Sequence, residues 1–486
     1  MKKRGIFSLV LLVVASTLFA TQDITDLGTS QELVIADTRY AEAETNTASS
    51  VSIITQEQIK AFHAQSTAEL VGKAIGTSFS SYGGLGSMQN VSIRGAGSSR
   101  SLIFLDGVLL ASAHDGTIDL SLIPVDMIER IEVIKSGPGN LGRTNAIGGM
   151  VNIISKKGQE SETPFSLTVE NGSFLPLTYD SNERNWLSLV DSQKLNLSYT
   201  NKGLVATIGG LAAQNAYTYN DGTATRKLRD NAQVYEANGA VNFNQAISDT
   251  LRFSTQNLVT YKNLGTPGSI TYVTPNDYQN DLFISTNNTI EVTEVSDVLE
   301  TLAAHLHYAY GQTFFHGYSD STHNKHNASA QVAGTWNLGQ AYTLDTNLLY
   351  NLDYVDSTDV GQNTRHTIAA AADGSVYLHD GSISLHPSVN IAYLSDLNTI
   401  SPNASMGAIF SLASDTDLKA SISYAENVPT FSQLFWPSPY GNPNLKTEKG
   451  LNGEIGVSTV VKFLTYEGTL FGRNIYNAIA NDSSYT

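Results

Sequence analysis

From about residue 160 onward, apolar and polar residues alternate with a period of two over long stretches. Over 342–354, one parity holds Tyr342, Leu344, Thr346, Leu348, Tyr350, Leu352 and Tyr354, and the other holds Thr343, Asp345, Asn347, Leu349, Asn351 and Asp353. The same alternation recurs over 302–310 and 418–424. Successive side chains of a β-strand point to opposite faces, so each of these strands has one apolar and one polar face. The pattern predicts an extensive sheet that separates two media, as in a transmembrane β-barrel with lipid outside and a polar lumen.

A soluble β-sandwich alternates in the same way, so the period alone leaves both architectures open. Two features favour the barrel. The strands are long, and turn-rich segments such as 276–281 and 319–327 separate them unevenly, which fits short turns at one rim and long loops at the other. The 23 tyrosines and the low charged fraction of 15% also suit a sheet, because a disordered chain carries more charge and fewer aromatic residues.

The first twenty residues have the pattern of a signal peptide. A basic start (Lys2, Lys3 and Arg4) precedes an apolar run over 6–15, which is too short to span a bilayer. Cleavage after Ala20 would release an exported chain. No later segment approaches about 18 consecutive apolar residues, so we expect no transmembrane helix.

Composition removes several classes of function. The chain has no cysteine, which excludes a disulfide framework, a zinc–cysteine site, a thiol nucleophile and a lipidated cysteine anchor. Its formal charge of -17 argues against a nucleic-acid partner, because phosphate binding needs a basic surface. We expect no enzyme, since no pattern of nucleophile, base and orienting group emerges and no metal-ligand spacing is convincing.

Residues 49–158 have a different character from the alternating region. Helix-like stretches at 56–62 and 67–75 alternate with short apolar strands, which lie at 91–93, 102–105, 131–134 and 151–154. Glycines punctuate these elements. The segment therefore predicts a small α/β domain, preceded by a polar, turn-rich segment over 21–48 with one apolar island at 33–35.

A series of motifs in this α/β region occurs in a fixed order. The motifs are Ser52-Ile53-Ile54-Thr55, Val91-Ser92-Ile93-Arg94-Gly95, Phe104-Leu105-Asp106-Gly107-Val108, 128–134 (IERIEVI), Ser136-Gly137-Pro138 and 146–154 (AIGGMVNII). Together they resemble the plug domain of TonB-dependent receptors over residues 51–154. The segment 441–449 (GNPNLKTEK) resembles the late-barrel signature of the same family.

This resemblance implies an antiparallel transmembrane β-barrel, typically of about 22 strands, with an N-terminal α/β plug in its lumen. It implies four segments: a signal peptide (1–20), a periplasmic segment (21–48), the plug (49–158) and the barrel (159–486). The last segment has room for roughly 14–16 strands if each takes 9–11 residues and a connection. We therefore expect that the sequence given is incomplete at its C-terminus.

The resemblance also implies TonB-dependent active transport across the outer membrane of a diderm (Gram-negative-type) bacterium. The expected TonB box comprises Glu32, Leu33, Val34, Ile35 and Ala36, a short β-prone island that would bind the TonB energy-coupling complex by strand addition. An adhesin or phage receptor could use the same barrel without energised transport. Such a protein would need no TonB box, so deletion of residues 31–37 would separate the two functions.

The resemblance places the ligand against two plug apices, with side chains for stacking and hydrogen bonding. The candidate residues are Ser81, Tyr82, Leu85 and Met88 in the first apex, and Ala111, Ser112, His114 and Asp115 in the second. Some of these are equally well explained as turn residues. For docking of the plug on the barrel wall, the resemblance points to Arg94, faced by Glu448 and Glu454.

The plug motifs and the 441–445 segment are most similar to the vitamin B12 (cobalamin) branch of the family. A corrinoid is therefore the expected small-molecule ligand, and a ferric siderophore or haem is the alternative. We expect no required cofactor. Calcium in the outer loops is an option through Asn220, Asp221 and Asp320, although acidic loop residues are usually only solvated.

Overall fold

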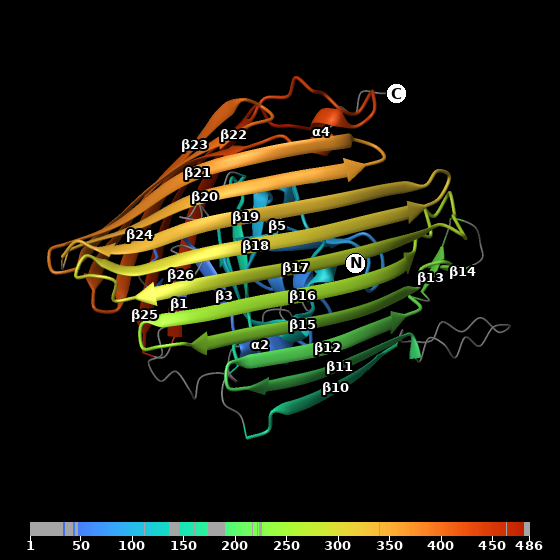
Figure 1. The fold of residues 1–486 in the computed structure, drawn as a ribbon, viewed down its shortest axis with the longest axis horizontal. Coiled ribbons are helices and arrows are strands. Elements are labelled where there is room, and N and C mark those ends of the chain that lie inside the picture. Colours follow the sequence, from blue (N-terminus) through green and yellow to red (C-terminus); the bar gives the residue numbers. More distant parts are fainter. Residues whose placement is uncertain are drawn as a thin grey trace, which may run out of the picture.

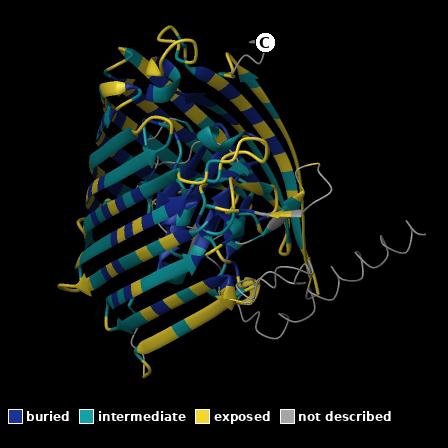
Figure 2. Ribbon diagram, turned by 90° about the vertical axis from the view of Figure 1, so that its right-hand side faces the viewer, coloured by how far each residue is buried: buried dark blue, intermediate teal, exposed yellow. Residues whose placement is uncertain are grey.

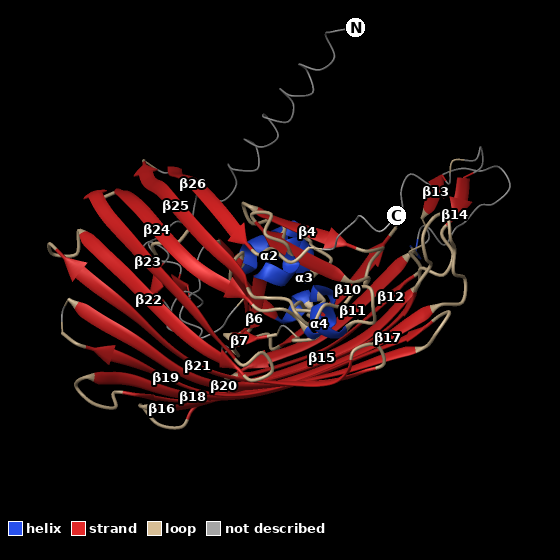
Figure 3. Cartoon of the chain, turned by 90° about the horizontal axis from the view of Figure 1, so that it is seen from above, coloured by secondary structure: helices blue, strands red, loops and turns tan. Residues whose placement is uncertain are grey.

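The computed structural model describes residues 33–34, 42–43, 47–110, 112–135, 145–158, 162–173, 190–215, 217–220, 222, 226–339, 341–462 and 464–480. These residues form a small mixed domain and a large curved sheet. Figure 3 shows the small domain, with helices α2 and α3, on the concave side of the sheet. The expected signal peptide and the Ser136-Gly137-Pro138 motif lie outside the described residues. Within the described part, no helix is long and apolar enough to cross a membrane.

The large sheet is antiparallel throughout, and each strand pairs with the next one in the order given (Figure 1). Its 15 strands within the described residues are β10 (Phe165–Gly172), β11 (Ser192–Asn201), β12 (Leu204–Ala213), β15 (Val234–Ala246), β16 (Leu251–Gly265), β17 (Tyr278–Thr293), β18 (Leu299–His316), β19 (Ser321–Asn337), β20 (Tyr342–Ser357), β21 (Gly361–Leu378), β22 (Ile383–Leu394), β23 (Thr399–Ala413), β24 (Thr416–Asn427), β25 (Glu448–Val461) and β26 (Leu464–Tyr476). A short hairpin of β13 (Thr218–Asn220) and β14 (Arg226–Leu228) belongs to the loop after β12.

The two faces of these strands reverse the usual rule of burial. In β20, the apolar parity points outward, with Leu348 65% exposed and Tyr350 42% exposed, whereas Asn347 and Asn351 are buried on the inner face. Striped ribbons in Figure 2 show the same alternation on the neighbouring strands. The alternation predicted from the sequence is therefore confirmed, and its apolar face is the one turned away from the plug. A sheet with this polarity suits an outer medium of lipid.

The connections at the two ends of the sheet differ in length. At one rim the turns are short, as at Lys202-Gly203 between β11 and β12 and at 414–415 between β23 and β24. At the opposite rim, long loops cover 214–233, 266–277 and 428–447. The expected asymmetry is present, but the turn-rich segments 276–281 and 319–327 were placed wrongly, because β17 begins at Tyr278 and β19 at Ser321. We refer to the two ends as the short-turn rim and the long-loop rim.

The small domain, which we call the plug, contains a five-stranded sheet with the order β3-β8-β9-β6-β7 and a separate hairpin of β4 and β5. Its strands are β3 (Val51–Ile54), β4 (Thr77–Ser81), β5 (Gln89–Ile93), β6 (Ser101–Leu105), β7 (Val108–Leu109), β8 (Ile128–Ile134) and β9 (Gly149–Ser155). Among the described strands of this sheet, β6 and β9 pair in parallel and the other pairs are antiparallel. The strands expected from the sequence are thus confirmed, each extended by a few residues or none.

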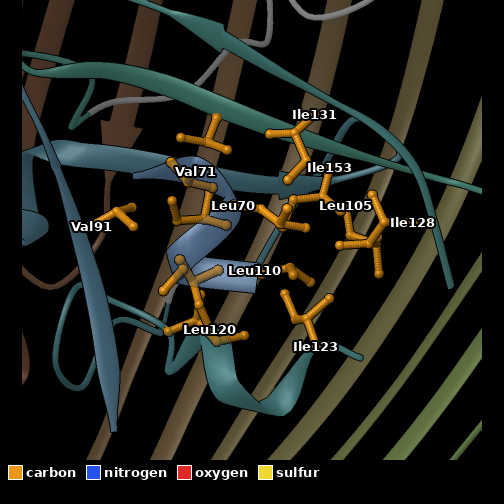
Figure 4. Close-up of a cluster of buried hydrophobic side chains, with 14 of the residues drawn as sticks. Leu70, Val71, Val91, Leu105, Leu110, Leu120, Ile123, Ile128, Ile131 and Ile153 are labelled. Carbon is orange, nitrogen blue, oxygen red and sulfur yellow. The ribbon is translucent and has the colours of Figure 1, made fainter. Parts of the chain in front are cut away.

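Two short helices, α2 (Gln56–Phe62) and α3 (Thr67–Val71), pack on this sheet. Thr55 starts α2 with a capping box, in which the Thr55 hydroxyl accepts from the Gln58 amide and the Gln58 side chain accepts from the Thr55 amide. Leu70 and Val71 of α3 enter a core with Ile131 and Ile153 (Figure 4). Burial of these apolar side chains is the main stabilising force of so small a domain.

Candidate functional site

A cavity of about 300 Å³ lies between the plug and the inner face of the sheet, near the long-loop rim. The plug contributes residues of both expected apices, and the wall contributes residues of β17 to β20 together with Trp436 of the loop 428–447. The lining includes Met88, Ser112, His114, Asp115, Asp119, Gln279, Asp281, Gln312, His323, Lys325, Asn327, Asp353 and Trp436. A volume of this size falls at the lower end of the range typical of small-molecule sites.

The second apex is attached to the loop 428–447. In that loop, α4 (Phe431–Phe435) begins at Thr430 with a second capping box. The Phe431 amide donates to the Ala113 carbonyl over 2.8 Å, and the Ser432 amide donates to the His114 carbonyl over 3.0 Å. These backbone bonds fix the position of the apex relative to the wall. Ala111 lies outside the described residues.

Phe431 is fully buried, and an arginine of the wall holds its position. Arg365 of β21 forms a two-point ion pair with Asp396, at 2.9 and 2.7 Å, and donates to the Pro429 carbonyl at 2.9 Å. Its guanidinium carbon lies 5.0 Å from the centroid of the Phe431 ring, which permits a cation–π contact. Neither Arg365 nor α4 stands out from its local sequence, so neither was predicted.

Asp115 is the junction of the second apex. The His114 Nδ1 atom lies 2.5 Å from Asp115 Oδ1, the Ser432 hydroxyl donates to the same oxygen at 3.3 Å, and the Lys325 ammonium lies 3.4 Å from Oδ2. Burial raises the pKa of the Asp115 carboxyl, but Lys325 and His114 outweigh burial and hold the pKa below its ordinary value. Asp115 is therefore ionised at neutral pH.

Two histidines of the cavity, His114 of the plug and His323 of β19, face each other across the gap between plug and wall. The ring centroids of His114 and His323 are 5.0 Å apart, and His323 Nδ1 lies 2.8 Å from the Ser357 hydroxyl. The Nε2 atom of His114 is buried and has no hydrogen-bond partner. His114 is 3% exposed, so the apex must shift before a ligand can reach this nitrogen.

The first apex is the tip of the β4–β5 hairpin. Ser81 and Tyr82 are exposed, with Tyr82 74% exposed, and Met88 lines the cavity. Asn215, from the loop after β12, is buried and anchors Leu85: its Oδ1 accepts from the Leu85 amide at 2.9 Å, and its Nδ2 donates to the Leu85 carbonyl at 3.0 Å. Of the four residues expected in this apex, the structure thus places Met88 at the cavity, whereas Ser81, Tyr82 and Leu85 do not line it.

Arg94 docks the plug on the wall. Its Nη1 lies 2.7 Å from Glu454 Oε2 in β25, and the two side chains are only 6% and 3% exposed. The same nitrogen donates to the Lys135 carbonyl at 3.0 Å, and the guanidinium carbon lies 4.3 Å from the centroid of the Phe471 ring. Arg94 sits in the left-handed region at φ 48, a costly conformation for a residue with a Cβ.

Glu448 contacts another arginine than the one we expected. The structure pairs it with Arg100, whose Nε and Nη2 donate to the two carboxylate oxygens at 2.8 and 2.5 Å. Asn427 and the Ile479 amide donate to the same carboxylate. Arg100 follows the motif that contains Arg94 by only a few residues, and no local pattern indicates which arginine faces which glutamate.

A third docking contact lies beside the cavity and was not expected. Lys262 of β16 is 0% exposed, and its ammonium lies 2.7 Å from Asp119 Oδ2 and 2.6 Å from the Ser121 hydroxyl of the plug. Asp281 of the neighbouring strand is 3.9 Å away. In the sequence, only the alternation of polar and apolar residues in β16 pointed to this contact, because it places Lys262 on the inner face of the strand.

Two of the five TonB-box residues are described. Leu33 and Val34 form β1, which pairs antiparallel with β2 (Glu42–Ala43), with Leu33 opposite Ala43 and Val34 opposite Glu42. Glu32, Ile35 and Ala36 lie outside the described residues. The backbone of this island therefore takes part in strand pairing within the chain.

The described residues contain no group of three or more His, Cys, Asp or Glu side chains arranged to hold a metal ion. Of the loop residues considered for calcium, Asn220 Oδ1 accepts from the Gly222 amide, Asp320 lies 2.7 Å from His316, and Asp221 is outside the described residues. Calcium binding in the outer loops stays a prediction.

Comparison with known proteins follows the two parts of the fold. Residues 43–150 match the TonB-dependent receptor plug domain, and residues 169–486 match the TonB-dependent receptor-like β-barrel. Among curated proteins, the vitamin B12 transporter BtuB of Photobacterium profundum is 25% identical over 469 residues, which cover 94% of this chain and 72% of that protein. BtuB of Vibrio cholerae is 23% identical over 481 residues, which cover 93% and 72%.

Solved structures of low sequence identity share the fold. A ferric enterobactin receptor (PfeA) mutant of Pseudomonas aeruginosa has a TM-score of 0.69 at 17% identity, over 91% of this chain and 73% of that one. The siderophore receptor PirA of the same species has a TM-score of 0.69 at 18% identity, over 89% and 75%. For the copper transporter OprC the TM-score is 0.65 at 16% identity, over 85% and 68%. Because the barrel family alone matches more than half of its residues, the chain belongs to the TonB-dependent receptor family.

Proposed function

We propose that the solute carried by this TonB-dependent receptor is a corrinoid such as cobalamin. The family transports scarce solutes across the outer membrane with energy coupled through TonB, and it is a class of receptors and transporters rather than of enzymes. The choice of a corrinoid has two kinds of support, one from relatives and one from the cavity.

Vitamin B12 transporters of two bacteria align with more than nine-tenths of this chain. The siderophore receptors match in fold at 15–18% identity, which supports the architecture and says little about the cargo. Identity of 23–25% is compatible with a change of substrate. The choice between a corrinoid and a ferric siderophore therefore depends on the chemistry of the cavity.

The observation that carries the proposal is the chemistry of the cavity between plug apex and wall. Its neutral hydrogen-bonding groups include Gln279, Gln312 and Asn327, and Trp436 supplies an aromatic surface. Amide side chains both donate and accept, which complements the amide groups on the periphery of a corrin ring. A cavity built for a strongly anionic ferric siderophore would instead concentrate arginine and lysine.

The route of energy transfer is part of the same proposal. The TonB box would leave its pairing with Glu42–Ala43 and add as a strand to TonB, since the backbone of an extended segment supplies the affinity in such complexes. Localisation in the outer membrane is implied by the family and is supported by the lipid-suited outer face of the sheet.

Calorimetric titration of the protein in detergent tests the cargo. Cyanocobalamin should bind saturably with one site per chain, whereas ferric enterobactin and haem should give no saturable heat. Saturable binding of the ferric siderophore alone would contradict the corrinoid proposal and identify a ferric siderophore as the cargo. Saturable binding of haem alone would point instead to His114 and His323 as its contacts.

A further inference from the structure

Charged groups are unevenly distributed around the cavity. Its described lining contains four carboxylates (Asp115, Asp119, Asp281 and Asp353) and a single lysine, Lys325. In the described part of the chain, Lys262 also pairs with two of these carboxylates, and its ammonium group is fully buried behind Asp119 and Asp281. The cation that a solute can meet in this cavity is therefore Lys325.

Lys325 is not available to a solute while Asp115 holds it. The ammonium lies 3.4 Å from Asp115 Oδ2, and both side chains are partly open, at 23% and 38% exposure. His114 and Ser432 contact the other carboxylate oxygen, so the carboxylate cannot swing away from the lysine without losing both bonds. Asp115 thus occupies the position from which a bound anion would contact Lys325.

We propose that Asp115 determines the charge selectivity of this receptor: it neutralises the one lysine of the cavity and thereby excludes anionic solutes while admitting uncharged, amide-bearing ones. The inference rests on the proposed function for the identity of the admitted solute. The exclusion of anions depends only on the charges around the cavity.

Elementary electrostatics predicts that the Asp115 carboxylate weakens the binding of an anion in this cavity. An anion in the cavity meets the Asp115 carboxylate at a few ångströms, and at an effective dielectric constant near 20 two like charges at that distance still repel each other. To use Lys325, the anion would have to break the existing pair and leave the Asp115 carboxylate uncompensated. Replacing the carboxylate by the isosteric amide removes the repulsion and frees the lysine.

The test measures binding of ferric enterobactin, an anionic complex, through quenching of tryptophan fluorescence, since Trp436 lines the cavity. Asp115→Asn should respond to ferric enterobactin at concentrations at least about tenfold below any that quench wild type at low ionic strength, and this gain should shrink as salt is added. The double variant Asp115→Asn with Lys325→Gln should lose that gain. Asp115→Ser serves as a second variant if the asparagine variant does not fold.

Asp353→Asn is the matched control, because it removes one carboxylate from the same lining while the Asp115–Lys325 pair stays intact. Asp353 accepts from Asn327 at 2.8 Å and from Asn351 at 2.7 Å. An equal gain in this control, or no gain in Asp115→Asn, would overturn the role of Asp115. A wild-type protein that fails to bind cyanocobalamin would refute the proposed cargo but leave the anion comparison valid.

Discussion

The guanidinium group of Arg94 lies 2.7 Å from the carboxylate of Glu454, and this contact joins the plug to strand β25 of the wall. The Ser50 amide donates to the other oxygen of Glu454 at 2.9 Å, and the Phe471 ring lies beneath the guanidinium group. Both oxygens of Glu454 and the Nη1 atom of Arg94 thus have partners in a nearly dry environment, which is the condition under which a buried ion pair is tolerated.

Removal of Arg94 should loosen the plug. Arg94→Ala leaves Glu454 buried without its charge partner, which costs about 3–5 kcal/mol of plug stability. Hydrogen exchange of the β5 and β8 amides should therefore accelerate. Lys73→Ala is the control: the Lys73–Glu69 pair is exposed on the plug surface, so its loss should cost less than about 1 kcal/mol. Equal protection of the plug in wild type and Arg94→Ala would contradict the docking role.

The ion pair of Lys262 should behave in the same way at the edge of the cavity. Lys262→Met keeps the length of the side chain but leaves Asp119 and Asp281 uncompensated, at a cost of about 3–5 kcal/mol. Adding Asp119→Asn should recover part of this loss, and a double-mutant cycle by chemical denaturation measures the coupling. Additive effects of the two substitutions would show that the pair does not couple plug and wall.

Gly149 occupies a position that only glycine satisfies. Its φ is +114, and a Cβ there would lie 2.3 Å from the Ile134 carbonyl oxygen of the neighbouring strand. Gly149→Ala should lower the free energy of unfolding by at least about 1–3 kcal/mol. The strain of the positive φ and the overlap of the new Cβ with the Ile134 oxygen both contribute to this loss. Gly468→Ala in β26 is the control, since a Cβ there meets nothing within 4 Å. Matching thermal stabilities for the two variants would refute the steric argument.

Asp106 predicts a pH dependence of plug stability. Burial raises its pKa from 3.8 to about 6, although the Ser155 amide donates to Oδ1 at 2.9 Å. Because the folded pKa exceeds the unfolded one, the contribution of Asp106 is fully present below pH 4 and is lost as the pH rises through 6. Asp106→Asn should therefore gain stability relative to wild type between pH 5 and pH 8, measured by denaturation at each pH. A difference that does not vary with pH would contradict this assignment.

The sequence predicted the parts of this fold that depend on local pattern. The alternation over 342–354 identified the inner and outer faces of β20, and the motif order identified the plug strands β5, β6, β8 and β9. These features depend on side-chain periodicity and on turn residues close by in the chain, so they can be recognised without knowledge of the tertiary contacts.

Contacts between the plug and the wall were predicted less well. Glu448 pairs with Arg100 rather than Arg94, and Asp119 meets Lys262 across 143 residues of chain. Such pairings depend on how the plug is rotated within the sheet, and that rotation is set by many weak contacts at once. The hydrogen bonds between Phe431 and the second apex have the same origin, because they join backbone groups whose side chains carry no signal of the pairing.

Uptake of labelled cobalamin by cells that lack their own cobalamin receptor tests whether this protein transports a corrinoid with energy from TonB. Cells that produce this protein should accumulate the label only when TonB is present. Val34→Pro, which removes a backbone donor from the TonB box, should abolish accumulation while the purified variant still binds cobalamin. Accumulation that persists without TonB, or no accumulation above that of receptor-free cells, would contradict TonB-dependent corrinoid uptake.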